Sequence, residues 1–248
     1  MERNRLLMVS RHIHSPVPMT STLVVVVPVY NEADYIPTAL PSLISTMDEV
    51  DVPYRILLVE NGSSDGTAEV AKQVAADSAV EVISLPDADY GAAMRRGFLE
   101  ADGNWVVNFD IDYFSAEFLR SVLSQPSSVD VVIASKRNPE SDDLRPPIRR
   151  VATFVFNLLL RIILDSKVSD THGMKGFRSK LIKELTPQVV STEDLFDTEL
   201  VIRAERSGYS IVEVPVTVEE LRAAKSSLIK RATRTVAGLF RIRGILKG

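Results

Sequence analysis

The sequence predicts an α/β fold: a mostly parallel sheet flanked by helices, with a more helical C-terminal part. Two observations predict it. Short β-rich runs alternate with longer helical patterns from Thr22 onward, and most of these runs are continuously apolar. Such alternation is typical of βαβ units, and continuous apolar runs are typical of strands that are buried on both faces.

The expected elements follow one another in order. Strands are predicted at residues 23–27, 55–59, 80–85, 105–109, 129–134 and 210–216. Helices are predicted at residues 31–47, 67–76, 91–101, 116–123 and 148–164, with an amphipathic one inside 191–208. Asn31 is the predicted N-cap of the first helix, because asparagine favours that position. Parallel sheets bind ligands at the carboxyl ends of their strands, and these ends carry polar residues at 28–32, 60–66 and 110–112.

Composition and charge remove several classes of function. The chain has 248 residues, a net charge of -4 and no cysteine. This charge gives no reason to expect nucleic-acid binding, and the lack of cysteine excludes disulfides, zinc–thiolate sites and thiol nucleophiles. Residues 1–20 are expected to form a flexible tail rather than a signal peptide. No apolar run reaches the roughly 18 to 20 residues of a membrane-spanning helix, so a cytoplasmic protein is expected.

A metal site is predicted at Asp110-Ile111-Asp112, directly after an apolar strand. Side chains two residues apart in extended backbone point the same way, so both carboxylates can face one cation. Hard oxygen ligands suit Mg²⁺ or Mn²⁺, which in turn bind diphosphates. An Asp-x-Asp pair alone is a common surface feature, but its place at the end of a buried strand favours the functional interpretation.

The turn Glu60-Asn61-Gly62-Ser63-Ser64-Asp65-Gly66-Thr67 has two compatible interpretations. It is rich in residues that adopt positive φ or cap helices, so Asp65 or Thr67 could simply cap the next helix. Glu60 also stands at a strand end, where its carboxylate could bind a nucleobase or a ribose.

Further motifs follow in the second half of the chain. They are Ser135-Lys136-Arg137, Arg149-Arg150 before a helix with Asn157, Ser169-Asp170-Thr171-His172-Gly173, Gly176-Phe177-Arg178, Phe196-Asp197-Thr198-Glu199-Leu200 and residues 222–228. Near the start of the chain, the motif Val26-Val27-Pro28-Val29-Tyr30-Asn31-Glu32 precedes the two motifs described above. In this order they resemble the family 2 glycosyltransferases of GT-A fold, most closely the dolichyl- and polyprenyl-phosphate sugar (mannose or glucose) synthases. The resemblance covers about residues 23–228.

The resemblance implies roles for particular residues. The nucleotide end of the site would comprise Pro28, Tyr30, Glu32, Glu60 and Asp65. Asp110 and Asp112 would hold the metal and the sugar diphosphate, and a phosphate of the donor or acceptor would meet Arg137, Arg149, Arg222 and Ser227. Glu60-Asn61 stands where the family usually has two aspartates, and Phe114 where some relatives have a polar ligand. The donor base, GDP or UDP, and the sugar therefore stay open.

The implied reaction is a displacement at the anomeric carbon with a single inversion. Asp112, Asp197 and Arg137 are the expected catalytic residues, and Asp197 with Glu199 are the candidates for a base or for orienting the acceptor. Alternatively, Asp197 only caps its helix.

Two segments suggest a peripheral contact with the cytoplasmic face of a membrane. The helix at 148–164 is apolar on more than one side and follows several arginines, and residues 225–248 form a basic amphipathic helix after a GT-A domain at 21–224. Both patterns also occur in ordinary packing helices.

Two alternatives stay open and a third is disfavoured. The first is a glycosyltransferase with a soluble acceptor, and the second is a non-catalytic nucleotide-sugar-binding module at a membrane. A nucleotidyltransferase is disfavoured, because no Gly-rich phosphate loop with Lys or Arg follows the first strand.

Overall fold

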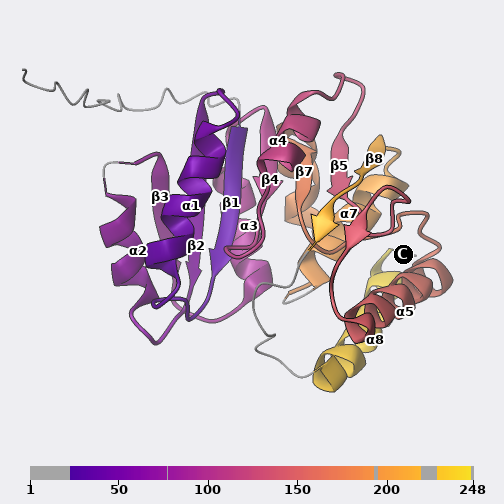
Figure 1. The fold of residues 1–248 in the computed structure, drawn as a ribbon. Helices are drawn as coiled ribbons and strands as arrows, with labels where there is room; N and C mark the ends of the chain where they lie inside the picture. Colours follow the sequence, from indigo (N-terminus) through magenta and orange to yellow (C-terminus); the bar gives the residue numbers. More distant parts are fainter. Residues whose placement is uncertain (1–22, 77, 193–194, 219–227, 247–248) are drawn as a thin grey trace, which may run out of the picture.

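The fold is a seven-stranded sheet between two layers of helices (Figure 1). The computed structural model describes residues 23–76, 78–192, 195–218 and 228–246. Its sheet has the order β3-β2-β1-β4-β7-β5-β8. The strands are β1 (Leu23–Val29), β2 (Tyr54–Asn61), β3 (Val80–Leu85), β4 (Trp105–Asn108), β5 (Val131–Ala134), β7 (Lys175–Arg178) and β8 (Ile211–Val214). All neighbours are parallel except the pairs that β7 forms with β4 and β5, so the predicted mostly parallel sheet is confirmed.

Eight α-helices and a small second sheet complete the described part of the chain. The helices are α1 (Ile36–Asp48), α2 (Thr67–Ala75), α3 (Tyr90–Glu100), α4 (Ala116–Leu123), α5 (Pro147–Leu164), α6 (Ser179–Leu185), α7 (Phe196–Arg206) and α8 (Leu228–Ile245), with a short 3-10 turn, η1 (Thr186–Gln188). Strands β6 (Asp142–Asp143) and β9 (Thr217–Val218) pair separately. Within the described residues, no helix is both long and apolar enough to cross a membrane.

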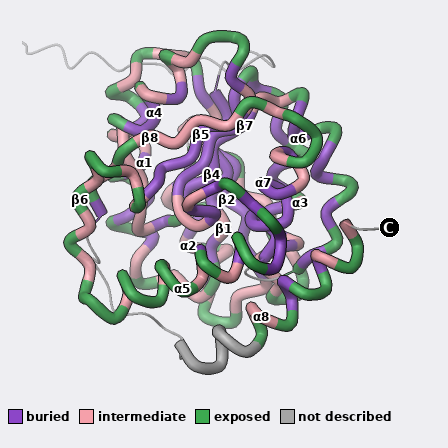
Figure 2. The backbone as a smooth tube through the Cα atoms, turned by 90° about the vertical axis from the view of Figure 1, so that its right-hand side faces the viewer, coloured by how far each residue is buried: buried purple, intermediate pink, exposed green. Residues whose placement is uncertain are grey.

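Alternate residues of the strands point to opposite faces of the sheet and pack in two separate hydrophobic cores. Val25 packs with α1, α2 and α4 on one face of the sheet, whereas Val24 packs with α3, α6 and α7 on the other. Because both faces are covered, the inner strands β1, β2, β4 and β5 are largely purple in Figure 2, and an unbroken run of valines is buried in β1. A third cluster joins α5, α7 and α8 through residues such as Leu160, Ile202 and Leu239. The C-terminal helix is therefore part of the packed structure.

Three sequence predictions need comment. Asn31 as N-cap of α1 is wrong: α1 begins at Ile36, and Asn31 has a φ of 52° in the preceding turn. Strand β7 and helix α6 were not expected from the sequence. The predicted tail at 1–20 and the boundary between 224 and 225 lie outside the described residues, so that division of the chain stays a prediction.

Candidate active site

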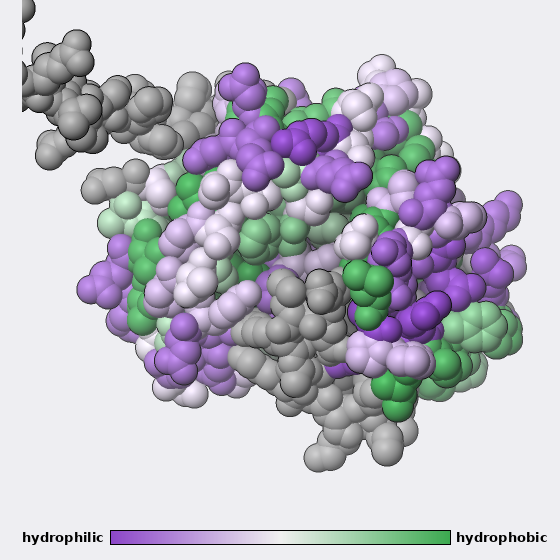
Figure 3. Space-filling view, in the orientation of Figure 1, coloured by the Kyte–Doolittle hydropathy of each residue, from purple (hydrophilic) through white to green (hydrophobic). Residues whose placement is uncertain are grey.

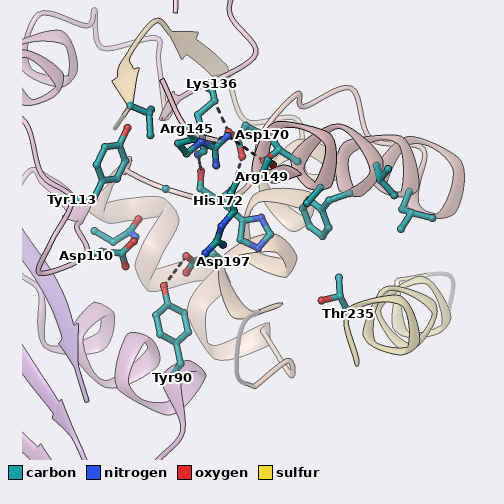
Figure 4. A pocket seen from close by; sticks show the side chains of 18 of the residues that line it. Tyr90, Asp110, Tyr113, Lys136, Arg145, Arg149, Asp170, His172, Asp197 and Thr235 are labelled. Atoms are coloured by element: carbon teal, nitrogen blue, oxygen red, sulfur yellow. Dashed lines mark hydrogen bonds and ion pairs between the residues drawn. The ribbon is translucent and has the colours of Figure 1, made fainter. Parts of the chain in front are cut away.

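A cavity of about 670 Å³ opens beside the carboxyl ends of β4 and β5 (Figure 4). Its polar wall comes from the sheet, the loops and α7, and its apolar wall from α5 and α8. The lining residues are Tyr90, Asn108, Asp110, Tyr113, Lys136, Arg145, Arg149, Ala152, Thr153, Val155, Phe156, Leu159, Asp170, His172, Gly173, Asp197, Val218, Thr235 and Val236. The cavity thus unites three residues that the sequence singled out: Asp110, Arg149 and Asp197.

Asp110 lies at the end of β4, where the chain turns sharply. The N–H of Tyr113 donates to the carbonyl of Asp110 at 3.0 Å and closes this turn. Asp110 is an exposed residue that opens to the cavity, although many protein atoms surround its carboxylate. Burial raises its pKa to about 6; the ammonium group of Lys175 opposes this rise, and the carboxylate of Asp112 adds to it. Asp112, half-buried, stands two residues on and does not line the cavity.

A divalent metal fits the donor atoms at this corner. Asp110 and Asp112 supply carboxylates, and the buried side-chain oxygen of Asn108 has no hydrogen-bond partner among the described residues. Within the same residues, no group of three His, Cys, Asp or Glu side chains forms a complete metal cage. Mg²⁺ is commonly held by one or two carboxylates, with phosphate and water completing its shell. The chain could therefore hold a cation together with a phosphate-bearing ligand.

The loops after β1 and β2 are hydrogen-bonded to one another. The N–H of Asn31 donates to the hydroxyl of Ser63 at 2.9 Å, and the N–H of Ser64 donates to the Asn31 side chain at 3.0 Å. Glu60 is only 3% exposed, and its carboxylate accepts the N–H of Ser63. Glu60 thus shapes the turn.

Asp65 ties the start of α2 to the β1 loop. Its carboxylate accepts N–H groups from Thr67 and Ala33 at 3.0 and 3.1 Å. The Thr67 hydroxyl in turn accepts the N–H of Glu32 at 2.8 Å. The N-cap of α2 is Gly66, so neither Asp65 nor Thr67 occupies the cap position that the sequence suggested. The turn is therefore built mainly from side chains that bind backbone groups.

The other residues predicted for the nucleotide end lie on the same edge of the sheet. Pro28 is within β1, and Tyr30, just beyond it, is 47% exposed. Arg222 and Ser227 lie outside the described residues.

Asp197 faces the cavity from the first turn of α7. The hydroxyl of Tyr90 and the ammonium of Lys175 both donate to its Oδ2, at 2.9 and 3.1 Å. The interpretation in which Asp197 caps α7 is wrong, because the N-cap is Leu195 and no side-chain bond is made there.

Glu199, the other acidic candidate on α7, points elsewhere. Its carboxylate accepts the N–H groups of Val190 and Ser191, and it forms an ion pair with Arg203 at 2.7 Å. It is fully buried and does not line the cavity. Glu199 therefore holds the 190–191 segment rather than a substrate.

A second buried lysine holds the loop before β7. The ammonium of Lys136 pairs with Asp170 at 2.9 Å and also donates to the carbonyl of His172 at 2.9 Å. The His172 ring packs edge-on against Phe156 of α5, with centroids 4.4 Å apart. Burial lowers the pKa of His172 to about 4, so its imidazole is neutral at pH 7.

The arginines near α5 occupy different places. Arg145 makes a double hydrogen bond with Asp143, at 2.8 and 2.7 Å, and lines the cavity with Arg149. Arg137 is exposed and lies over the Phe154 ring at 5.2 Å, outside the cavity lining. The structure thus separates Arg137 from the cavity to which Arg149 belongs.

Sequence reasoning missed several residues of the cavity, among them Tyr90 and Asn108. It missed Lys175 as well, although an isolated lysine among Met174, Gly176 and Phe177 is a usable signal for a paired buried charge. No comparable signal marks Tyr90, whose partner Asp197 is 107 residues away.

Comparisons with known proteins agree with this architecture. The family model described as "Glycosyl transferase family 2" matches residues 24–186. An undecaprenyl-phosphate mannosyltransferase from Micrococcus luteus is 30% identical over 212 residues, covering 82% of this chain and 86% of the relative. A dolichyl-phosphate hexose transferase from Haloferax volcanii is 29% identical over 209 residues, covering 83% and 86%. The glycosyltransferase AglD from Haloferax volcanii is 29% identical over 215 residues, covering 83% of this chain but 34% of AglD.

Solved structures share the fold. Mannosyl-3-phosphoglycerate synthase from Rubrobacter xylanophilus superposes with a TM-score of 0.64 at 25% identity, covering 90% of this chain and 75% of that one. Glucosyl-3-phosphoglycerate synthase from Mycobacterium tuberculosis, in complex with Mn²⁺, UDP and glucosyl-3-phosphoglycerate, has a TM-score of 0.62 at 20% identity, covering 90% and 78%.

Proposed function

Because this chain belongs to glycosyl transferase family 2, we propose that it is a metal-dependent, inverting hexosyltransferase that acts on a polyprenyl or dolichyl phosphate. The donor would be a GDP- or UDP-linked sugar, of the GDP-mannose or UDP-glucose type. One observation carries the proposal: a single cavity joins Asp110, two arginines and an apolar helix wall. A sugar diphosphate, an acceptor phosphate and a hydrocarbon chain each have a matching surface there.

The donor would bind across the carboxyl edge of β1, β2 and β4. In this proposal Pro28, Tyr30, Glu32, Glu60 and Asp65 form the nucleotide end. Asp110 and Asp112 would hold Mg²⁺ or Mn²⁺, which would stabilise negative charge on the departing diphosphate. The M. tuberculosis enzyme has been crystallised with Mn²⁺ and with Mg²⁺, which supports this choice of cation.

If the acceptor is a phosphate, the transfer reaction needs no general base from the protein. The bond from the anomeric carbon to the diphosphate oxygen breaks, and its electrons leave with the nucleoside diphosphate. An acceptor phosphate oxygen supplies the pair for the new bond on the opposite face, which inverts the carbon. A phosphate is already ionised near neutral pH, so no base has to remove a proton. Arg145 and Arg149 would orient it, because guanidinium groups bind phosphate oxygens bidentately.

A lipid acceptor is favoured by the exposed face of α5. Ile148, Val151, Val155, Leu158 and Ile162 recur every three or four residues and are 45–66% exposed. Val155 also lines the cavity, so the stripe adjoins the cavity. This stripe lies at the lower right of Figure 3, where apolar side chains gather over α5, and exposed Arg150 and Arg161 flank it. Amphipathic helices with basic flanks bind at membrane surfaces. A peripheral membrane contact is therefore part of the proposal.

A soluble acceptor is the second candidate. Both structural neighbours are named as hexosyl-3-phosphoglycerate synthases, and a small phosphorylated acceptor would also fit between Arg145 and the sheet. With a soluble acceptor, the exposed stripe on α5 would not be needed to reach a lipid.

A transfer assay separates the candidates. The protein, with Mn²⁺ or Mg²⁺, would be incubated with each radiolabelled UDP- and GDP-hexose and either a polyprenyl phosphate in detergent or 3-phosphoglycerate. Label that enters the lipid phase would support the proposal, and label on 3-phosphoglycerate alone would support the soluble candidate. Donor binding without turnover on any acceptor would favour a non-catalytic nucleotide-sugar-binding module.

A further inference from the structure

Lys175 is a charged residue in the middle of the sheet. It begins β7, which pairs on both sides with β4 and β5, and its side chain is fully buried. Fully buried lysines need strong partners. Here the ammonium donates to the carbonyl of Gly173 at 2.6 Å and to the carboxylate of Asp197 at 3.1 Å. Both partners line the cavity, whereas Lys175 stands behind it.

The bonds to Asp197 are asymmetric. Tyr90 and Lys175 both donate to Oδ2, and Oδ1 has no hydrogen-bond partner in the described part of the chain. Asp197 is 7% exposed, and its carboxylate is held through Oδ2. The lone pairs of Oδ1 can therefore accept a hydrogen bond from a ligand. Figure 4 shows Asp197 on the cavity wall with the Tyr90 bond beneath it.

We propose that Lys175 is a positioning residue that, with Tyr90, turns Oδ1 of Asp197 toward a hydroxyl group of the donor sugar. This inference rests on the proposed function. A sugar hydroxyl is the fitting ligand, because a carboxylate accepts its hydrogen bond but repels a phosphate. Charge matters as well as geometry, because a carboxylate forms stronger hydrogen bonds than a neutral acceptor does.

The test is a double-mutant cycle on sugar transfer. Asp197→Asn, Lys175→Met and the double variant would be compared, with Lys183→Met on the exposed face of α6 as the matched control. We expect Lys175→Met to lower kcat/KM by about 10²-fold, as misplacement of a site group does. In the Asp197→Asn background the same change should cost less than about 3-fold, because residues that act through one another are non-additive.

Binding of bare nucleotide separates positioning from general damage. The Kd of UDP or GDP with Mn²⁺ should stay within about twofold in Lys175→Met, since neither carries the sugar. Multiplicative effects of the two substitutions, or unchanged kcat/KM in Lys175→Met, would overturn the role of Lys175 while leaving the proposed function intact. A wild-type protein that transfers no sugar from any donor would overturn both.

Folding is the remaining risk, since Lys175→Met leaves Asp197 without its cation. The double variant avoids this because the pair becomes neutral, and Tyr90→Phe, which leaves the Lys175–Asp197 pair intact, carries the test if Lys175→Met does not fold. Tyr90→Phe, which removes the other bond to Oδ2, should show the same non-additivity with Asp197→Asn.

Discussion

Asp197 and Glu199 stand two residues apart on α7 and face opposite surroundings. Asp197 reaches the cavity and binds Tyr90 and Lys175, whereas Glu199 is fully enclosed and binds the 190–191 backbone and Arg203. Each helical residue turns the side-chain direction by about 100°, so positions two apart differ by about 200°. Only one of the pair can serve a substrate.

Exchanging these two carboxylates for amides should therefore have different effects on catalysis: the change at Asp197 should lower kcat strongly, and the change at Glu199 should not. Glu199→Gln should lower the unfolding free energy by about 1–3 kcal/mol, because charge-assisted bonds to buried N–H groups are weakened. Its kcat should stay within about threefold of wild type. Asp197→Asn should lower kcat by about 10²-fold, and because it leaves the buried ammonium of Lys175 without its anion it should lower stability as well. Urea unfolding and steady-state kinetics would measure both, and a Glu199→Gln variant that is stable but inactive would contradict the assignment.

Asp112→Ala should remove metal-dependent donor binding without unfolding the protein. At 100 times its dissociation constant, UDP or GDP with Mn²⁺ should stabilise the wild type by about 2.7 kcal/mol, and this gain should vanish in the variant. A thermal-shift titration with and without EDTA measures it. The matched control is Asp102→Ala at the opposite end of β4, where only a surface ion pair with Arg55 is lost. Metal-dependent turnover that survives in Asp112→Ala would refute the site.

The sheet could be predicted largely from the sequence because its strands are uninterrupted apolar runs. Every predicted strand exists within a few residues of the expected ends. Strand β7 could not be predicted in this way, since Lys175 and Gly176 break the apolar pattern and the strand depends on its neighbours. Its lysine is tolerated only because Asp197 and Gly173 supply partners that the local sequence does not reveal.

The site was predictable where its residues follow strands, and not where they meet across the fold. Asp110 and the Glu60 turn follow from strand ends, which meet at one edge of a parallel sheet. Arg137 and Arg149 look alike in the sequence, yet only Arg149 turns inward, because α5 begins between them. Asn31 was predicted as a helix cap but binds the β2 turn instead, since such side chains serve either purpose equally well.

Gly62→Ala should disturb the proposed nucleotide end. Gly62 has a φ of 65°, and an added Cβ would lie 2.5 Å from the backbone carbon of Asp87. We expect a loss of stability of about 1–3 kcal/mol and at least about tenfold weaker UDP or GDP binding. Gly244→Ala in α8, where no atom lies within 4 Å, is the control and should be neutral or slightly stabilising. Calorimetric titration checks this, and unaltered nucleotide affinity in Gly62→Ala would place the nucleotide elsewhere.

Acid should destabilise the protein through His172. Its folded pKa of about 4 lies below the ordinary value of 6.5, so the unfolded chain binds more protons between these limits. The stability contributed by the neutral ring is complete above pH 6.5 and is lost as the pH falls toward 4, by at most about 3 kcal/mol. His172→Gln should flatten this slope in urea unfolding series. The chain has only three histidines, so NMR titration can follow the His172 ring separately. A His172 pKa near 6.5 would contradict the prediction.

The exposed stripe on α5 allows a sharper test of membrane contact than removal of the C-terminal helix. Deleting residues 227–248 would expose the core, because Leu239 and Ile242 of α8 are fully buried. Val151→Asn with Ile162→Asn instead alters two side chains that are 60% and 65% exposed, on one face of α5. Each buried aliphatic side chain contributes about 1.5–3 kcal/mol, so sedimentation with anionic vesicles should weaken about tenfold or more per residue. Leu99→Asn, at a residue that is 52% exposed on α3, is the control. An equal loss of vesicle binding in both variants, or no loss in either, would leave α5 without a role at the membrane.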